Sequence, residues 1–158
     1  MTACPSPILY HHVALVVPDL QEGMDQLGAA LGLTWASVQK HNLHVWTPDG
    51  PIRAPLECTY SQQGPPYWEL FQQQPTGIYT ELGHHHYGLF ADGQQAQVDK
   101  LAEIGYFQEF AGTDADGNLR GFRYLKDSSG NRIEVLERAE SEPMLKRWIA
   151  GGDYYGDR

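Results

Sequence analysis

Residues 83–93, with the sequence Gly-His-His-His-Tyr-Gly-Leu-Phe-Ala-Asp-Gly, have the composition of a short β-strand, and a helical pattern follows them at once. An earlier stretch, residues 10–19, has the same character and reads Tyr-His-His-Val-Ala-Leu-Val-Val-Pro-Asp. When His86 is aligned with His12, the next fifteen residues stay in step, so that Leu101 falls on Leu27. The chain therefore contains a duplicated unit, and each copy opens with a strand that carries a histidine.

A second pair of matching segments closes the two copies. The segment Trp-Glu-Leu-Phe at 68–71 corresponds to Ile-Glu-Val-Leu at 133–136, so that Glu69 and Glu134 stand at equivalent places. Both segments have the branched and aromatic composition of strands. Each copy thus closes with a strand that carries a glutamate.

The residues between these landmarks predict the same order of elements in both copies. Branched and aromatic runs indicate strands, and apolar residues at helical spacing that end at a glycine indicate helices. In the first copy, Asp19 is the expected N-cap of the helix and Gly32 its end. The predicted strands are 8–17, 33–39, 43–47, 56–61, 67–72, 84–91, 106–111, 119–126 and 132–136, and the predicted helices are 20–32, 94–104 and 142–150, with one helical turn at 76–82.

These elements predict an α+β fold in which two βαβββ modules stand in tandem and their curved, mixed sheets enclose a cleft. We place the first module at 8–74, a linker at 75–83, the second module at 84–138, and a terminal helix and tail at 139–158. A chain of 158 residues is long enough to bury a core and is expected to form one domain overall.

Two histidines and two glutamates at equivalent places in a duplicated fold indicate one shared site. Successive side chains of a strand alternate between faces, so we expect each of these histidines to point away from the histidine before it. Two modules related by a pseudo-two-fold axis bring their first and last strands around one cleft. The four candidate metal ligands are His12, Glu69, His86 and Glu134. Such mixed nitrogen and oxygen donors suit one divalent ion of Fe, Mn, Co, Ni or Zn.

Composition excludes several classes of function. The net charge of −9 and the pI near 5.1 disfavour nucleic acid, which rewards clustered lysine and arginine. No apolar run approaches the length of a membrane span, and no signal peptide is evident, so a cytoplasmic protein is expected. In that compartment Cys4 and Cys58 are expected as thiols.

The motifs around these residues resemble those of the vicinal oxygen chelate superfamily, which includes glyoxalases, bleomycin-resistance proteins and extradiol dioxygenases. The resemblance covers about residues 8–138 and includes the hairpin Asp-Ser-Ser-Gly-Asn at 127–131, close to the family's usual Asp-Pro-Asp-Gly-Asn. It implies that His12, Glu69, His86 and Glu134 are the metal ligands. Among its branches, residues 69–86 are most similar to methylmalonyl-CoA epimerase-like and glyoxalase I-like proteins, although Glu69 stands where that epimerase commonly carries glutamine. The resemblance also implies a homodimer, with residues 140–158 as a candidate to cross its interface.

For function, the resemblance implies a metal-dependent isomerase, epimerase or lyase that abstracts a proton next to a carbonyl group of a small molecule. The metal would chelate vicinal substrate oxygens and stabilise an enediolate. The catalytic base would be Glu134 or Glu69, or Glu57 if it lies beside the metal. No phosphate-binding glycine loop or other cofactor motif is present in the sequence.

Two other functions are compatible with the same residues. An Fe(II) extradiol-type dioxygenase would use two histidines and one carboxylate and leave three positions for catechol and O₂, and the fourth ligand Glu69 disfavours it. A non-catalytic small-molecule binding protein, as in resistance, would lack the ligands that are present here. We expect Tyr60, Tyr67, Phe122 and Tyr124 as candidates to line the cleft, and Arg53, Arg120 and Arg123 as candidates to anchor an anionic substrate.

Overall fold

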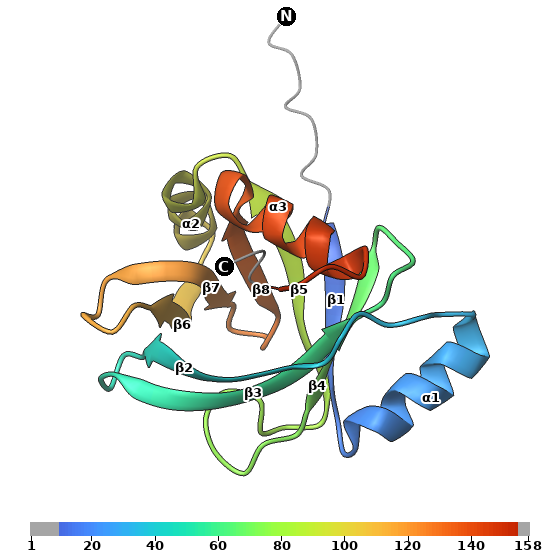
Figure 1. Ribbon diagram of the computed structural model, residues 1–158. Coiled ribbons are helices and arrows are strands. Elements are labelled where there is room, and N and C mark those ends of the chain that lie inside the picture. The colour runs from blue at the N-terminus through green and yellow to red at the C-terminus, as the bar shows by residue number, and fades with distance from the viewer. Residues whose placement is uncertain (1–9, 155–158) are drawn as a thin grey trace, which may run out of the picture.

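The computed structural model describes residues 10–154 and contains eight strands and three helices in the order βαβββ, βαβββ, α (Figure 1). Cys4 lies outside the described residues, as do 155–158. The elements are β1 (Tyr10–Val17), α1 (Leu20–Leu31), β2 (Gln39–Trp46), β3 (Ile52–Tyr60), β4 (Tyr67–Gln72), β5 (Gly83–Ala91), α2 (Gln94–Glu103), β6 (Phe107–Thr113), β7 (Leu119–Lys126), β8 (Arg132–Glu137) and α3 (Arg138–Ile149).

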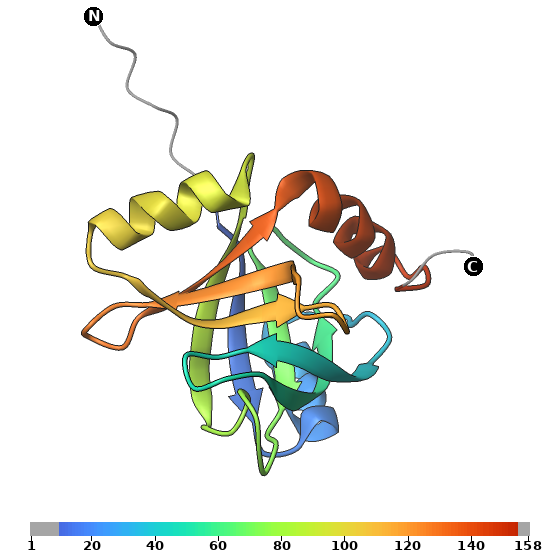
Figure 2. The same cartoon turned by 90° about the vertical axis from the view of Figure 1, so that its left-hand side faces the viewer.

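The strands form a closed barrel in the order β1-β4-β3-β2-β6-β7-β8-β5. Within each module the first and last strands pair in parallel, and the other pairs are antiparallel. The modules join through antiparallel β1 and β5, and the barrel closes through two residue pairs of β2 and β6, Val45 with Gly112 and Trp46 with Ala111. The α+β fold of two βαβββ modules is confirmed (Figure 2). The sheets were predicted to enclose a cleft, and they instead form a closed barrel.

Three predicted elements differ from the structure. Residues 33–38 form no ladder: Trp35 makes an isolated bridge with Ser61, and Ala36 is hydrogen-bonded to Tyr60 and Thr59 at the end of β3, so β2 begins only at Gln39. The segment 76–82 contains bends and no helical turn. Helix α3 begins at Arg138, four residues before the predicted start, and the Arg138 guanidinium donates to Glu142 across its first turn.

Helices α1 and α2 lie on opposite outer sides of the barrel in Figure 1. Helix α1 has the predicted caps: Asp19 accepts from the Glu22 N–H at 2.8 Å, and Gly32 ends the helix at φ 69°. The N-cap of α2 is Gly93, which has no side chain to cap with. The carboxylate of Glu137, at the end of β8, accepts from the N–H groups of Gly93 and Gln94 instead.

Helix α3 lies across one end of the barrel and closes it with apolar side chains. Leu145, Trp148 and Ile149 of α3 are buried and belong to the core inside the barrel. The Trp148 indole N–H donates to the Ser37 carbonyl at 2.8 Å, which ties the helix to the other module. A second, smaller core lies between α2 and the outer face of the sheet. No helix within residues 10–154 is long and apolar enough to cross a membrane.

Candidate metal centre

Four buried side chains, one from each of four strands, converge on a single point inside the barrel. His12 Nε2 lies 3.0 Å from His86 Nε2, 3.2 Å from Glu69 Oε2 and 3.0 Å from Glu134 Oε2. His86 Nε2 lies 3.3 Å from each of the same two carboxylate oxygens. These are the four residues that the sequence selected as candidate ligands, and all are buried.

The pairing of the strands explains why the four side chains meet. Ala14 of β1 stands between His86 of β5 and Glu69 of β4. At the equivalent place in the second module, Gly88 of β5 stands between His12 of β1 and Glu134 of β8. In both places a small residue stands between a histidine of one module and a glutamate of the other module. Its small size leaves space above the sheet for both larger side chains.

Gly88 is indispensable for the position of His12. Its φ is not positive, so the backbone would accept another residue, but a methyl group built at its α-carbon overlaps the His12 imidazole. Ala14 already carries such a methyl group beneath the other half of the site and is fully buried. The two positions are thus equivalent in the sheet, but only position 14 has room for a methyl group.

Two register shifts between β1 and β5 place a second histidine behind each candidate ligand. Tyr10 pairs with Leu89 and His12 with Gly88, so His11 is an extra residue on β1. Ala14 pairs with His86 and Leu15 with His84, so His85 is an extra residue on β5. A bulge breaks the alternation of side chains. The prediction that each ligand histidine points away from its predecessor is therefore wrong.

The extra histidines contact the candidate ligands through ring nitrogens. His11 Nδ1 lies 3.0 Å from His12 Nδ1, and His85 Nδ1 lies 2.8 Å from His86 Nδ1. His85 Nε2 donates to the Ile78 carbonyl oxygen at 2.9 Å. His11 instead packs against the rings of Tyr67 and Phe90. Burial holds the pKa of His85 well below its ordinary value and lowers that of His11 to about 3, so both remain neutral at pH 7.

The protein without metal compensates the buried carboxylates with protons. Burial lowers the pKa of His12, but the adjacent carboxylates of Glu134 and Glu69 outweigh it and raise the pKa to about 9. Burial raises the pKa of Glu134 and of Glu69, yet the two histidines outweigh it and hold both values below their ordinary range. The cluster is therefore ionised at neutral pH and retains a proton on His12.

The donor set fits a divalent transition metal. Atoms bound at about 2.0–2.2 Å to one ion lie about 2.9 Å apart in an octahedron and about 3.4 Å in a tetrahedron, which brackets the separations of 3.0–3.3 Å found here. Glu69 Oε2 and Glu134 Oε2 are buried, make no hydrogen bond of regular geometry, and have the histidine Nε2 atoms as their near polar neighbours. Two buried carboxylates are costly unless cationic charge lies beside them, and a metal ion would supply more of it than the proton on His12 does. His12, Glu69, His86 and Glu134 could hold that cation.

The candidate site opens on the inside of the barrel. Glu69 and Glu134 line a cavity that extends from the cluster toward α3, and His12 and His86 lie behind them. Glu57, the third candidate base, is not brought to the site. It falls between Leu56 and Cys58, which face the cavity, and so points outward and pairs with Lys40 at 3.1 Å.

Of the other residues that the sequence singled out, Tyr60, Phe122 and Tyr124 line this cavity, and Tyr67 lies outside it beside His11. None of the three candidate arginines lines it. Sequence reasoning gave no role to His11, His85 or Gly88. A signal for them exists, because a His-His doublet followed two residues later by a small residue occurs in both copies.

We expect metal binding to release a proton, since the metal requires the neutral imidazole of His12, whose pKa is about 9 in the metal-free protein. Affinity should rise about tenfold per pH unit up to about pH 9. The stability of the metal-free protein should change in the opposite direction. A pKa above the unfolded value of 6.5 stabilises the fold fully below pH 6.5 and progressively less as the pH rises to about 9. Calorimetric titration with Zn²⁺ in buffers of different ionisation enthalpy counts the protons, and thermal unfolding after chelation measures the second trend.

Comparisons with known proteins agree with this architecture. No protein-family model matches the chain, and no curated protein matches it. Among solved structures, it is similar to methylmalonyl-CoA epimerase from Mycobacterium tuberculosis, with 14% identity and a TM-score of 0.62 over 90% of this chain and 96% of that chain.

A variant of methylmalonyl-CoA epimerase from Streptomyces coelicolor, in complex with 2-nitronate-propionyl-CoA, has 13% identity and a TM-score of 0.57 over 84% of this chain and 98% of that chain. A hypothetical protein from Bacillus halodurans C-125 has 14% identity and a TM-score of 0.60 over 84% and 95%. The property shared at these identities is the fold. The chain thus shares the fold of these epimerases, which has two βαβββ modules in tandem.

Proposed function

We propose that this chain is a metal-dependent enzyme of the epimerase, isomerase or lyase type that removes a proton from the carbon next to a carbonyl group. The observation that supports this most is the pair Glu69 and Glu134, the carboxylates that line the cavity within the described part of the chain. The M. tuberculosis and S. coelicolor proteins of the same fold are epimerases.

The four candidate ligands would bind one divalent ion, which would supply Lewis acidity to substrate oxygens when bound. The chain itself supplies the proton acceptor. Glu69 and Glu134 are held ionised by the histidines and belong to different modules, so they reach the cavity from strands β4 and β8. One carboxylate can take the proton at an Oε atom, and the carboxylic acid formed in this way can exchange its proton with water and return one to the carbanionic carbon.

The test is hydrogen exchange at the methylene group of 2-hydroxyacetophenone in D₂O, followed by proton NMR with Zn²⁺-, Ni²⁺- or Co²⁺-loaded protein. We expect Glu69→Gln or Glu134→Gln to slow exchange by at least about 100-fold, because a general base contributes about that much or more. Glu57→Gln is the matched control and should exchange like the wild type. Equal rates in all three metal-loaded variants would contradict the proposal, and binding without exchange would indicate a binding protein.

A homodimer remains a prediction, which light scattering in solution tests. Residues 138–149 form α3, which packs on the chain's own barrel and buries Trp148. The tail 155–158 lies outside the described residues.

A further inference from the structure

We propose that the end of the substrate that enters the barrel is uncharged and apolar, and is no larger than one six-membered ring beside two neighbouring oxygen atoms. This rests on the proposed function, because it assumes that the substrate reaches the cluster through the cavity. The observations that carry it are the size of the cavity, the character of its walls and the charges that surround it.

The cavity has a volume of about 130 Å³. An engineered apolar cavity of about 150 Å³ binds benzene, which sets the scale. A ring of that size fits here, and a larger substrate would have to leave its remaining part outside the cavity. The size limit therefore applies to the reacting end.

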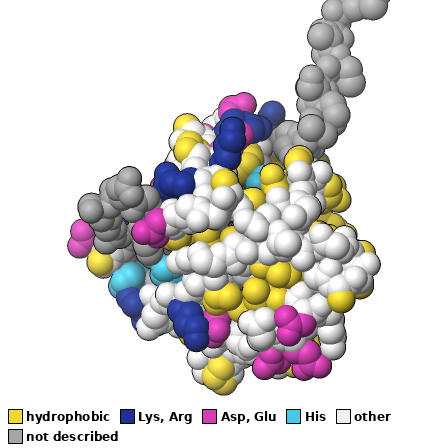
Figure 3. All heavy atoms as spheres, turned by 45° about the vertical axis from the view of Figure 1, so that its right-hand side comes forward, with side chains coloured by type: hydrophobic (Ala, Val, Ile, Leu, Met, Phe, Trp, Pro, Cys, Tyr) yellow, Lys and Arg dark blue, Asp and Glu magenta, His cyan; other side chains and the backbone are white. Residues whose placement is uncertain are grey.

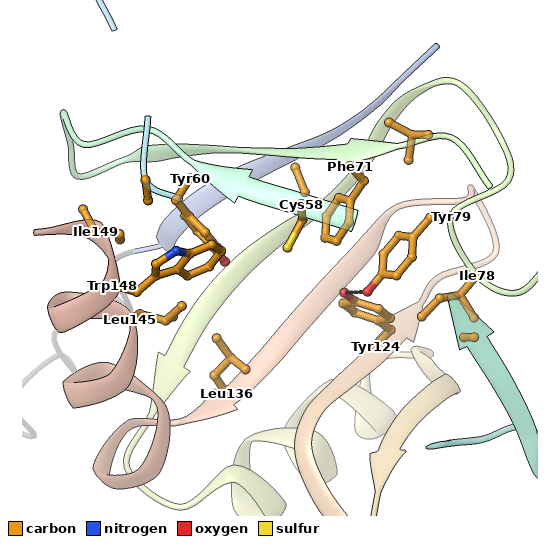
Figure 4. Packing of buried hydrophobic residues seen from close by; sticks show 14 of the residues in the cluster. Cys58, Tyr60, Phe71, Ile78, Tyr79, Tyr124, Leu136, Leu145, Trp148 and Ile149 are labelled. Carbon is orange, nitrogen blue, oxygen red and sulfur yellow. Dashed lines mark hydrogen bonds between the residues drawn. The ribbon is translucent and has the colours of Figure 1, made fainter. Parts of the chain in front are cut away.

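The walls of the cavity are largely apolar. Aromatic and aliphatic side chains from both modules face it, among them Phe71, Phe122, Leu136, Leu145 and Trp148. Figure 4 shows Trp148 and Leu145 of α3 near Tyr60, with Tyr79 and Tyr124 at the other end. The hydroxyl groups of Tyr79 and Tyr124 are 2.9 Å apart and one donates to the other, so this pair leaves a single O–H group to offer to a ligand.

The charges near the cavity are unsuited to a substrate anion. No lysine or arginine in residues 10–154 lines it, whereas Glu69 and Glu134 do. Arg123 is turned outward and donates to the side chains of Gln95 and Gln108, and Arg120 faces Glu140 at the surface. On the face shown in Figure 3, lysine and arginine side chains are scattered and form no continuous patch. A carboxylate within the cavity would be buried without a cationic side chain, which is costly.

Two hydroxamic acids test this directly, because each offers two vicinal oxygens to a metal and they differ only at the far end of the ring. We expect benzohydroxamate to bind the Zn²⁺-loaded protein at least about tenfold more tightly than 4-carboxybenzohydroxamate, since the second probe buries an unpaired charge. Calorimetric titration measures both. Met144→Lys places a cation of similar length on the α3 side of the cavity and should reduce the difference to less than about threefold, whereas Met144→Gln should preserve it.

Equal or tighter binding of the carboxylated probe to the wild type would overturn the proposal, as would failure of both probes to bind protein that retains its metal. Hydrogen exchange is not part of this measurement. The hydroxamate titration can therefore support an apolar, uncharged substrate even if the exchange assay shows no proton transfer. The exchange assay can likewise show proton transfer even if the titration contradicts this substrate class.

A different observation carries a second inference: we infer that His85 is a positioning residue that fixes the tautomer of His86. A carbonyl oxygen only accepts, so His85 must use its single N–H at Nε2 to reach Ile78. Its Nδ1 is then an acceptor, and the proton of the 2.8 Å contact belongs to His86 Nδ1. In the neutral form of His86, the form that a metal requires, Nε2 then carries the lone pair and lies 3.3 Å from an oxygen of each carboxylate. A ligand histidine held in this way is ready to bind a metal.

The test uses metal-free protein labelled with ¹⁵N at histidine. The wild type should show His86 protonated at Nδ1, and His85→Leu should shift the proton to Nε2 and lower Zn²⁺ affinity by about 10–100-fold. His85→Asn offers an oxygen acceptor in place of Nδ1 and should restore both properties. A His85→Leu variant that folds and keeps the Nδ1 proton, or that keeps the wild-type affinity, would overturn the inference.

Discussion

His86→Ala is expected to be isolated without metal under conditions in which the wild type carries about one equivalent of a transition ion. Loss of a residue that only supports a ligand commonly costs about 10–100-fold in metal affinity, and His86 is itself a candidate ligand with its Nε2 at the centre of the cluster. We therefore expect a loss of more than about 100-fold. Mass spectrometry on protein purified without an affinity tag gives the metal content.

Glu69→Ala separates a site of four ligands from a site of three. Glu69 and Glu134 make the same set of approaches to the histidines, and each has a buried oxygen without a hydrogen bond. We expect Glu69→Ala to lose its metal as His86→Ala does. Metal that persists in Glu69→Ala and disappears in His86→Ala would instead support a triad of two histidines and one carboxylate, and would make oxygen chemistry the better hypothesis.

Gly88→Ala should have an effect nearly as large, although Gly88 can ligate nothing. The added methyl group would overlap the His12 imidazole, which is fully buried. We expect metal affinity to fall by more than about 100-fold, since the change displaces a ligand and not only its support. Overpacking of a core costs about 1–3 kcal/mol of stability, so the variant should still fold. Metal content and thermal unfolding are measured together.

Ala14→Gly is the matched control for this change, because Ala14 holds the equivalent place in the first module. It removes a methyl group and adds the chain freedom of glycine, which costs about 0.5–1 kcal/mol of stability, and it should leave metal binding intact. If Gly88→Ala binds metal as well as Ala14→Gly does, His12 is not a ligand in the position described.

The architecture and the four converging residues follow from the sequence because duplication makes them visible. A histidine and a glutamate that recur at the same places in two copies need no knowledge of tertiary contacts to be singled out. The hairpin at 127–131 could also be predicted from the sequence. The Asp127 carboxylate accepts from the backbone N–H groups of Ser129 and Asn131, and Gly130 adopts the positive φ of 90° that the turn requires. Local chemistry determines such features.

What the sequence did not predict depends on how distant segments meet. The barrel closes through two residue pairs between β2 and β6, and no sequence pattern predicts that these two strands pair. Alternation misplaced His11 and His85 because a bulge is decided by the register of two strands and not by either strand alone. Glu57 was a reasonable base until the register of β3 turned Leu56 and Cys58 into the cavity and so turned Glu57 outward, where it pairs with Lys40.

The paired bulges also bear on how such a protein can originate. One module holds one histidine doublet and one glutamate, which is half of the cluster, so a shorter chain with a single module would complete the site only by pairing with an identical copy. When the two modules are fused in one chain, they no longer have to be identical. Each half can then accept substitutions that the other cannot. Position 14 is alanine where the equivalent position 88 is glycine. His85 is hydrogen-bonded to a backbone carbonyl, whereas the equivalent His11 packs against two aromatic rings.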